Sequence, residues 1–133
     1  MKFLLLACVV VSCFILSWSQ LVPSPPEAAL SDASKNCMVK ENVDSEAVFG
    51  FKSGKIRPED VSAVFKCFVR CVVEAKGYMK DGELLEENVV KAAENITSVE
   101  QVRKIISNCK VHKGSNVCET SFNIYMCISS ELK

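Results

Sequence analysis

The chain has 133 residues, of which 24% are charged and 49% hydrophobic, with 16 basic and 16 acidic side chains. This balance gives no excess of positive charge that would favour binding to nucleic acid or to an anionic membrane surface. The length predicts a single domain that is large enough to bury a core.

The N-terminal stretch MKFLLLACVVVSCFILSWSQ predicts a secretory signal peptide. A basic Lys2 precedes a long apolar run, and small residues follow at Ser17 and Ser19, as in a signal peptide and its cleavage site. The alternative is a membrane anchor, because an apolar run of about 16 residues is only slightly shorter than a membrane span. We expect cleavage after Ser19, which removes residues 1–19 and leaves a secreted, extracellular chain.

Cleavage changes the composition of the chain. Removing 19 of the 133 residues leaves 114, and the loss of Lys2 leaves 15 basic against 16 acidic side chains, a net charge of −1. Cys8 and Cys13 are also removed, so six of the eight cysteines remain. An even number of cysteines in a small secreted chain is typical of a disulfide framework.

Residues 20–31 predict an extended N-terminal arm, since this segment holds three of the four prolines. From residue 32 onward, apolar residues recur at intervals of three and four, which favours helices over strands. We therefore expect a single all-α domain over residues 32–133, with about five to seven helices.

Start and stop signals place the first two helices. One is expected over Asp32–Phe49, ending near Gly50. The next is expected to begin with Pro58 at its first helical position and to stop at Gly77.

The second half of the domain predicts a turn and three helices. YMKDGELL indicates a turn around Asp81-Gly82. LEENVVKAAEN predicts a short helix, and SVEQVRKIISNCKVHKG a longer one, with Ser98 and Gln101 as a capping box and Gly114 as its stop. NVCETSFNIYMCISSEL predicts the closing helix.

The cysteine spacing restricts the disulfides without fixing them. Cys67 and Cys71 lie at i and i+4 on one helix, with Cβ atoms about 5–6 Å apart, whereas a disulfide needs about 3.5–4.5 Å. Cys118 and Cys127 lie nine residues apart and face opposite sides of a helix. Each of the four therefore needs a partner elsewhere, and ten of the fifteen possible pairings of six cysteines remain.

Metal and redox chemistry fit the cysteine pattern poorly. The C-x3-C spacing in KCFVRC lacks the matching second ligand pair of a zinc site, and the C-x-x-C motif of a redox pair is absent. We expect disulfide anchors, with no metal and no cofactor.

The whole six-cysteine pattern resembles that of the insect odorant-binding proteins. Successive cysteines are separated by 29, 3, 37, 8 and 8 residues, and the gap of three and the final gap of eight are characteristic of that family. The stretch KGYMKDGEL is also similar to the family's turn between its third and fourth helices. The resemblance covers essentially the whole mature chain.

The resemblance implies a compact six-helix fold around an internal apolar cavity that carries odorants, pheromones or similar small lipophiles. It implies three disulfides, Cys37–Cys71, Cys67–Cys118 and Cys109–Cys127, all of which are among the ten pairings left open. It also implies a monomer or weak homodimer, with an odorant receptor as a further partner.

Apolar residues at helical spacing are candidates for the wall of this cavity, although ordinary core packing is their alternative role. Methionine and phenylalanine suit a pocket that accepts several ligand shapes, and the Tyr78 and Tyr125 hydroxyls can meet an alcohol or carbonyl. The candidates are Phe65, Phe68, Val72, Met79, Leu84, Val89, Ile105, Phe122, Tyr125 and Met126.

No motif indicates an enzyme, since G-x-S-x-G and H-E-x-x-H are both absent. The sole histidine, His112, is expected to complement the carboxyl end of a helix, and a pH sensor is its alternative role. Asn95 begins the sequon NIT and is a candidate glycosylation site. Its alternative is to end one helix while Thr97 or Ser98 caps the next.

These observations predict a secreted, non-enzymatic carrier of small hydrophobic ligands. The rival hypothesis is a secreted interaction protein, such as a venom, salivary or seminal factor, on the same scaffold. A closed apolar cavity favours the carrier, whereas a large exposed apolar patch favours the interaction protein.

Overall fold

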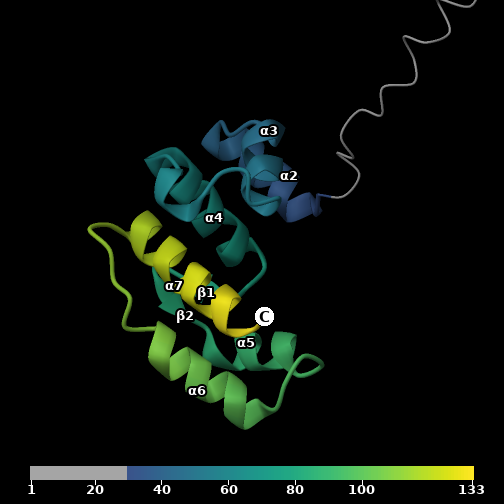
Figure 1. The fold of residues 1–133 in the computed structure, drawn as a ribbon, viewed down its shortest axis with the longest axis vertical. Helices are drawn as coiled ribbons and strands as arrows, with labels where there is room; N and C mark the ends of the chain where they lie inside the picture. The colour runs from purple at the N-terminus through teal and green to yellow at the C-terminus, as the bar shows by residue number, and fades with distance from the viewer. Residues whose placement is uncertain (1–29) are drawn as a thin grey trace, which may run out of the picture. The chain divides into compact units, whose positions relative to one another are not determined.

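The computed structural model describes residues 30–133, of which Ser31–Lys133 form one compact unit (Figure 1). Within this part of the chain there are six α-helices, one 3-10 helix and a two-stranded hairpin, so the predicted all-α class is confirmed. The predicted signal peptide, and the predicted arm up to residue 29, lie outside the described residues. None of the described helices is both long and apolar enough to cross a bilayer.

The N-terminal helical segment is two helices, α2 over Asp32–Glu41 and α3 over Ser45–Lys52. Asn42 ends α2 because it adopts a left-handed conformation, with φ of 54°. The Val43 backbone N–H then donates to the Met38 carbonyl at 2.9 Å, which satisfies one of the last carbonyls of the helix.

A new helix begins immediately after this stop. The Asp44 carboxylate accepts a hydrogen bond of 2.7 Å from the Ala47 backbone N–H and caps the start of α3. The predicted single helix over Asp32–Phe49 is therefore wrong, because the sequence ENVD contains a helix stop followed by a helix start.

The predicted start of the next helix at Pro58 is also wrong. Pro58–Asp60 form a single 3-10 turn, and the chain is extended at Val61. Helix α4 spans Ala63–Ala75, and the Ser62 hydroxyl caps it by accepting from the Phe65 N–H at 3.1 Å. Serine is a stronger N-cap than its apolar neighbours, so the regular helix begins there.

Gly77 ends α4 as predicted. It has a φ of 76°, and its N–H donates to the Glu74 carbonyl while that of Tyr78 donates to the Val73 carbonyl, both at 2.9 Å. This is the Schellman pattern, in which a left-handed residue closes the last turn.

The predicted turn at Asp81-Gly82 is confirmed, and it joins two short strands that were not predicted. β1 (Met79–Lys80) pairs antiparallel with β2 (Glu83–Leu84). Asp81 and Gly82 both have positive φ, of 50° and 81°, which matches the twist of a two-residue hairpin loop. Strands of two residues carry no periodicity, so the sequence pattern does not reveal them.

The remaining helices are α5 (Glu86–Ala93), α6 (Val99–Cys109) and α7 (Val117–Glu131). Ser98 caps α6 as predicted, accepting from the Gln101 N–H at 3.2 Å. The predicted stop at Gly114 is wrong, because α6 already ends at Cys109.

Gly114 instead lies beside the first turn of α7. A Cβ atom built on Gly114 would approach the Glu119 Cβ to 2.7 Å and the Glu119 backbone carbon to 2.9 Å. The glycine is required there because no larger residue leaves room for Glu119.

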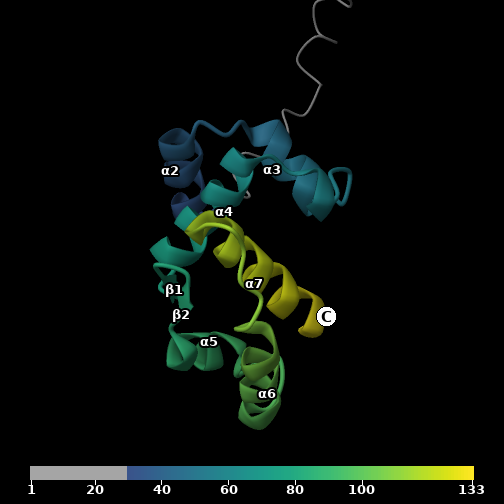
Figure 2. The same cartoon turned by 90° about the vertical axis from the view of Figure 1, so that its left-hand side faces the viewer.

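Three disulfides join four of the helices, and they are the pairs that the family resemblance implies. Cys37–Cys71 joins α2 to α4, Cys67–Cys118 joins α4 to α7, and Cys109–Cys127 joins α6 to α7. Cys67 and Cys71 thus bond to different helices. Figure 2 shows α7 beside α4, and the helix contacts agree with this arrangement.

The buried side chains form two groups. Phe51, Phe65, Phe68 and Phe122 make an aromatic cluster from α3, α4 and α7, with neighbouring ring centroids 5.0–6.0 Å apart. An aliphatic group joins α5 to α6 and consists of Val89, Val90, Ala93, Val102 and Ile106.

The left-handed conformation of Gly77 yields a stability prediction. Gly77→Ala should lower the free energy of unfolding by about 1 kcal/mol, because a Cβ atom disfavours positive φ. Gly77→Asn should lower it less, since asparagine tolerates this region. Urea denaturation measures both, and equal losses for the two variants would contradict the explanation.

The disulfides yield a second prediction. Residues Cys67 and Cys118 are separated by 51 positions and Cys109 and Cys127 by 18. The double variant Cys67→Ala/Cys118→Ala should lose about 4 kcal/mol and Cys109→Ala/Cys127→Ala about 3 kcal/mol, because the longer loop restricts the unfolded chain more. The reverse order in urea denaturation would show that loop entropy does not govern the difference.

Candidate functional site

An apolar pocket of about 250 Å³ lies between the end of α4, the hairpin, α5 and α7. One wall comes from α4 and the hairpin, and consists of Val73, Tyr78, Met79 and Leu84. A second comes from α5 and the turn after it, and consists of Val89, Ala92, Ala93 and Ile96. The third comes from α7, and consists of Ile124, Tyr125, Ile128, Ser129 and Leu132.

The wall on α7 follows from helical periodicity. Ile124, Ile128 and Leu132 recur every four residues, so they project from neighbouring positions on one face of the helix. The Cys109–Cys127 bond attaches a neighbouring face of α7 to α6. This bond orients the helix so that its aliphatic face meets the hairpin and α5.

The apolar pocket opens to the surface. Met79 and Val89 are buried, whereas Ile96 is 62% exposed and Tyr125 37% exposed at its edge. No charged side chain among residues 30–133 lines it. The expected internal cavity is thus, in this structure, an uncharged recess with an exposed apolar rim.

The structure places four of the ten predicted wall residues in this pocket: Met79, Leu84, Val89 and Tyr125. Tyr78, named for its hydroxyl, also lines it.

The other six predicted residues do not line it. Phe65, Phe68 and Phe122 belong to the aromatic cluster, and Ile105 is buried within α6. Val72 and Met126 are partly buried. Core packing and pocket lining use the same helical spacing, so the pattern does not separate these roles.

The sequence reasoning missed several wall residues on α7. Ile124, Ile128 and Leu132 form a stripe at spacings of four, a signal visible in the sequence. Phe122 and Met126 are predicted from the same helix because they are apolar residues at helical spacing. They project from a different face, and Phe122 packs against Phe51 instead.

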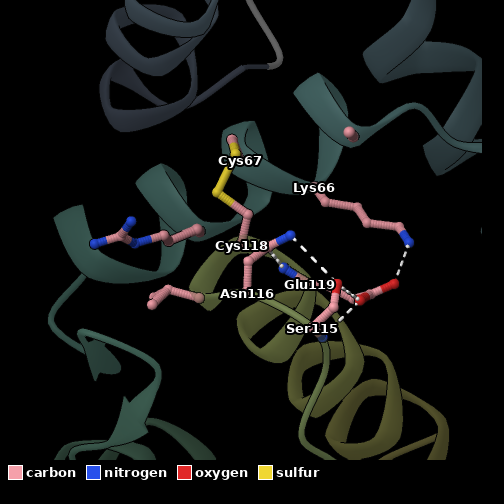
Figure 3. Close-up of a pocket in the computed structure, with 9 residues that line it drawn as sticks. Lys66, Cys67, Ser115, Asn116, Cys118 and Glu119 are labelled. Atoms are coloured by element: carbon pink, nitrogen blue, oxygen red, sulfur yellow. Dashed lines mark hydrogen bonds and ion pairs between the residues drawn. A yellow bond between two sulfur atoms is a disulfide. The ribbon is translucent and has the colours of Figure 1, made fainter.

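A second recess, the polar pocket, has a volume of about 510 Å³ and lies where the start of α7 meets α4 (Figure 3). Several of its charged and polar groups pair with one another. Lys66 Nζ donates to Glu119 Oε1 at 3.1 Å, and the Ser115 N–H and hydroxyl donate to Glu119 Oε2 at 2.8 and 2.6 Å. The Cys67–Cys118 disulfide forms part of its wall. We therefore interpret the polar pocket as a structural junction.

Comparisons with known proteins agree with this fold and with the cysteine pattern. The model of the PBP/GOBP family, the pheromone- and general-odorant-binding proteins, matches residues 22–131. The chain belongs to this family.

One relative is general odorant-binding protein 56a of Drosophila melanogaster, with 35% identity over 65 residues, 49% of this chain and 47% of the relative. The match thus spans about half the length of that protein. Among solved structures, the fatty acid binding protein OBP56a from the oral disk of the blowfly Phormia regina has a TM-score of 0.66 and 26% identity, over 74% of this chain and 84% of its own.

A further solved structure supports the fold alone. Odorant-binding protein dmelOBP28a from Drosophila melanogaster has a TM-score of 0.60 and 18% identity, over 76% of this chain and 87% of its own.

The other predicted functional residues lie on the surface of this family member. His112 is exposed just beyond α6, and its backbone N–H donates to the Cys109 carbonyl at 3.1 Å. Asn95 is exposed in the turn between α5 and α6, and its glycosylation stays a prediction. Residues 30–133 contain no cluster of three or more His, Cys, Asp or Glu side chains that would hold a metal ion.

Glu119 supplies the one carboxyl group among the residues that line the polar pocket. Hydrogen bonds from the Ser115 side chain and backbone, and then the Lys66 ammonium, lower the pKa of Glu119 to about 2. The ionised carboxylate therefore stabilises the junction of α4 with α7. Because the pKa is lower in the folded state, this contribution is present above about pH 4.5 and is lost as the pH falls towards 2.

This shift predicts how stability depends on pH. Glu119→Gln should lower the melting temperature at pH 7 and flatten its decline between pH 5 and 2, since the variant has no carboxylate to protonate. Glu46→Gln, at an exposed position in the first turn of α3, is the control and should keep the decline of the parent protein. An unchanged decline in Glu119→Gln would contradict the assignment.

Proposed function

We propose that this protein is a secreted, non-enzymatic carrier that holds small hydrophobic ligands in the apolar pocket. The observation that carries the proposal is an uncharged pocket, open at one edge, in a chain of the PBP/GOBP family. A ligand that leaves water for such a pocket gains about 25 cal/mol for each Å² of apolar surface buried. Release needs no chemical step, because nothing covalent is formed.

The blowfly relative supports a lipophilic ligand, since it is described as a fatty acid binding protein. The pocket volume of about 250 Å³ is slightly below the range of about 300–1,000 Å³ that is usual for small-molecule sites. It suits a short hydrocarbon chain, and the exposed rim at Ile96 and Tyr125 can cover the end of a longer one. Odorants, pheromones and similar lipophiles are the ligand classes that we propose.

Secretion, a monomeric or weakly dimeric state and delivery to an odorant receptor complete the proposal. The predicted signal peptide supports secretion, and three disulfides suit an oxidising extracellular compartment.

The first test is equilibrium binding of a naphthylamine fluorescent probe to the mature chain, residues 20–133, with its three disulfides verified by mass. We expect saturable micromolar binding with a blue shift, displaced by long-chain alcohols or esters. The absence of binding to the disulfide-intact protein would overturn the carrier function and favour the interaction protein.

A variant that fills the apolar pocket provides a second prediction, with a matched control variant. Ile128→Trp adds bulk within the apolar pocket and should weaken probe binding at least tenfold, whereas Val39→Trp adds a tryptophan at a position that is 85% exposed on α2 and should not. The probe is excited at its own absorption band, so that the new tryptophans do not contribute. Equal affinities in both variants would place the ligand elsewhere.

A further inference from the structure

Ser121 has a buried hydroxyl that nothing in the fold explains. The residue is 0% exposed, and its Oγ has no hydrogen-bond partner within the described residues 30–133. Buried polar groups are nearly always paired, because an unmade hydrogen bond is costly in a low-dielectric interior. An apolar side chain of similar size would avoid this cost, so the hydroxyl needs another reason to be there.

Ser121 shares a helical face with three wall residues of α7, although it does not itself line the apolar pocket. Positions 121, 125, 128 and 132 are separated by four, three and four residues and therefore share one helical face, and the last three line the apolar pocket. Ser121 lies four residues, about 6 Å, before Tyr125 along the helix axis, towards the N-terminal end of α7.

The elements on either side enclose this position. Earlier on α7, Val117 and Thr120 lie four residues and one residue before Ser121 and against the hairpin tip, since a Cβ built on Gly82 would lie 3.5 Å from a side-chain carbon of each. One turn later, Ile124 lines the pocket with Met79 of the same hairpin. Ser121 therefore lies on the stretch of α7 between its contact with the hairpin tip and the wall of the pocket.

We propose that Ser121 is the polar anchor of the apolar pocket, whose ligand is a lipophile with an uncharged oxygen, such as an alcohol, aldehyde, ketone or ester. The ligand oxygen shares a hydrogen bond with Ser121 Oγ, and its hydrocarbon chain lies against the aliphatic walls towards the rim. Met79 is flexible and unbranched, and its movement admits the ligand head. This proposal rests on the proposed function and specifies the ligand class.

The charges around the pocket argue for an uncharged head. None of the residues that line it is charged, and the nearby cations on α4 are engaged outside it. Lys66 pairs with Glu119, and Arg70 pairs with Glu74 and Asp81. A carboxylate at Ser121 would lose its hydration without gaining a counterion, which is far more costly than burying a neutral oxygen.

The test compares Ser121→Ala with the parent protein, using displacement of the naphthylamine probe by 1-octanol and by octanoate. In the parent, 1-octanol should bind more tightly than octanoate. Ser121→Ala should weaken 1-octanol about fivefold to tenfold, the loss of one hydrogen bond, and leave the affinity of the apolar probe unchanged. Ser130→Ala removes an exposed serine of α7 that does not line the pocket, and it should leave both affinities unchanged.

The outcomes separate this proposal from the proposed function. If neither the probe nor 1-octanol binds the parent protein, the carrier function itself fails. If both bind and Ser121→Ala alters neither, or weakens both equally, the anchor role is overturned while the carrier function stands. Octanoate that binds as tightly as 1-octanol overturns the uncharged head. The melting temperature of Ser121→Ala should not fall, since its buried hydroxyl makes no internal hydrogen bond.

Discussion

Two cysteines one turn apart on α4 cannot bond each other, and the arrangement of the helices depends on this constraint. Cys71 bonds to α2 and Cys67 bonds to α7, so α4 is held from two directions. Helix α7 is held in the same way, because its second cysteine bonds to α6. The bonds therefore link α2, α4, α7 and α6 in one covalent series. They join α4 to α7, two of the elements that line the apolar pocket.

Stability and ligand binding are assigned to different parts of the domain. The aromatic cluster of α3, α4 and α7 packs with ring centroids 5.0–6.0 Å apart, which supplies a filled core near the Cys67–Cys118 bond. Aliphatic side chains at the other end of α4 and α7 leave the apolar pocket open. The charged groups are confined to surfaces such as the polar pocket, where Lys66 and Glu119 pair with each other. A lipophilic ligand thus meets an uncharged wall.

Local signals located the elements wherever a single residue decides the backbone conformation. Gly77 and the pair Asp81-Gly82 have positive φ, and Ser98 caps α6, so each marks a boundary that the sequence predicted. The errors arose where two signals compete. Asn42 ends a helix within an otherwise helical pattern, and Ser62 begins one after a proline that also favours a helix start. In the second case the helix begins after Ser62, because serine is the better N-cap.

By itself, the sequence determined the helical class, the separate partners of Cys67 and Cys71, and the family, because these depend on spacing along one chain. The tertiary structure decided which apolar faces pack and which remain open. Phe122 and Ile124 lie two residues apart on α7, yet one joins the aromatic cluster and the other lines the pocket. Helical periodicity states which residues share a face, but the neighbour of that face is set by long-range packing and disulfides. For the same reason the burial of Ser121 could not be predicted, because it depends on how the helices pack together.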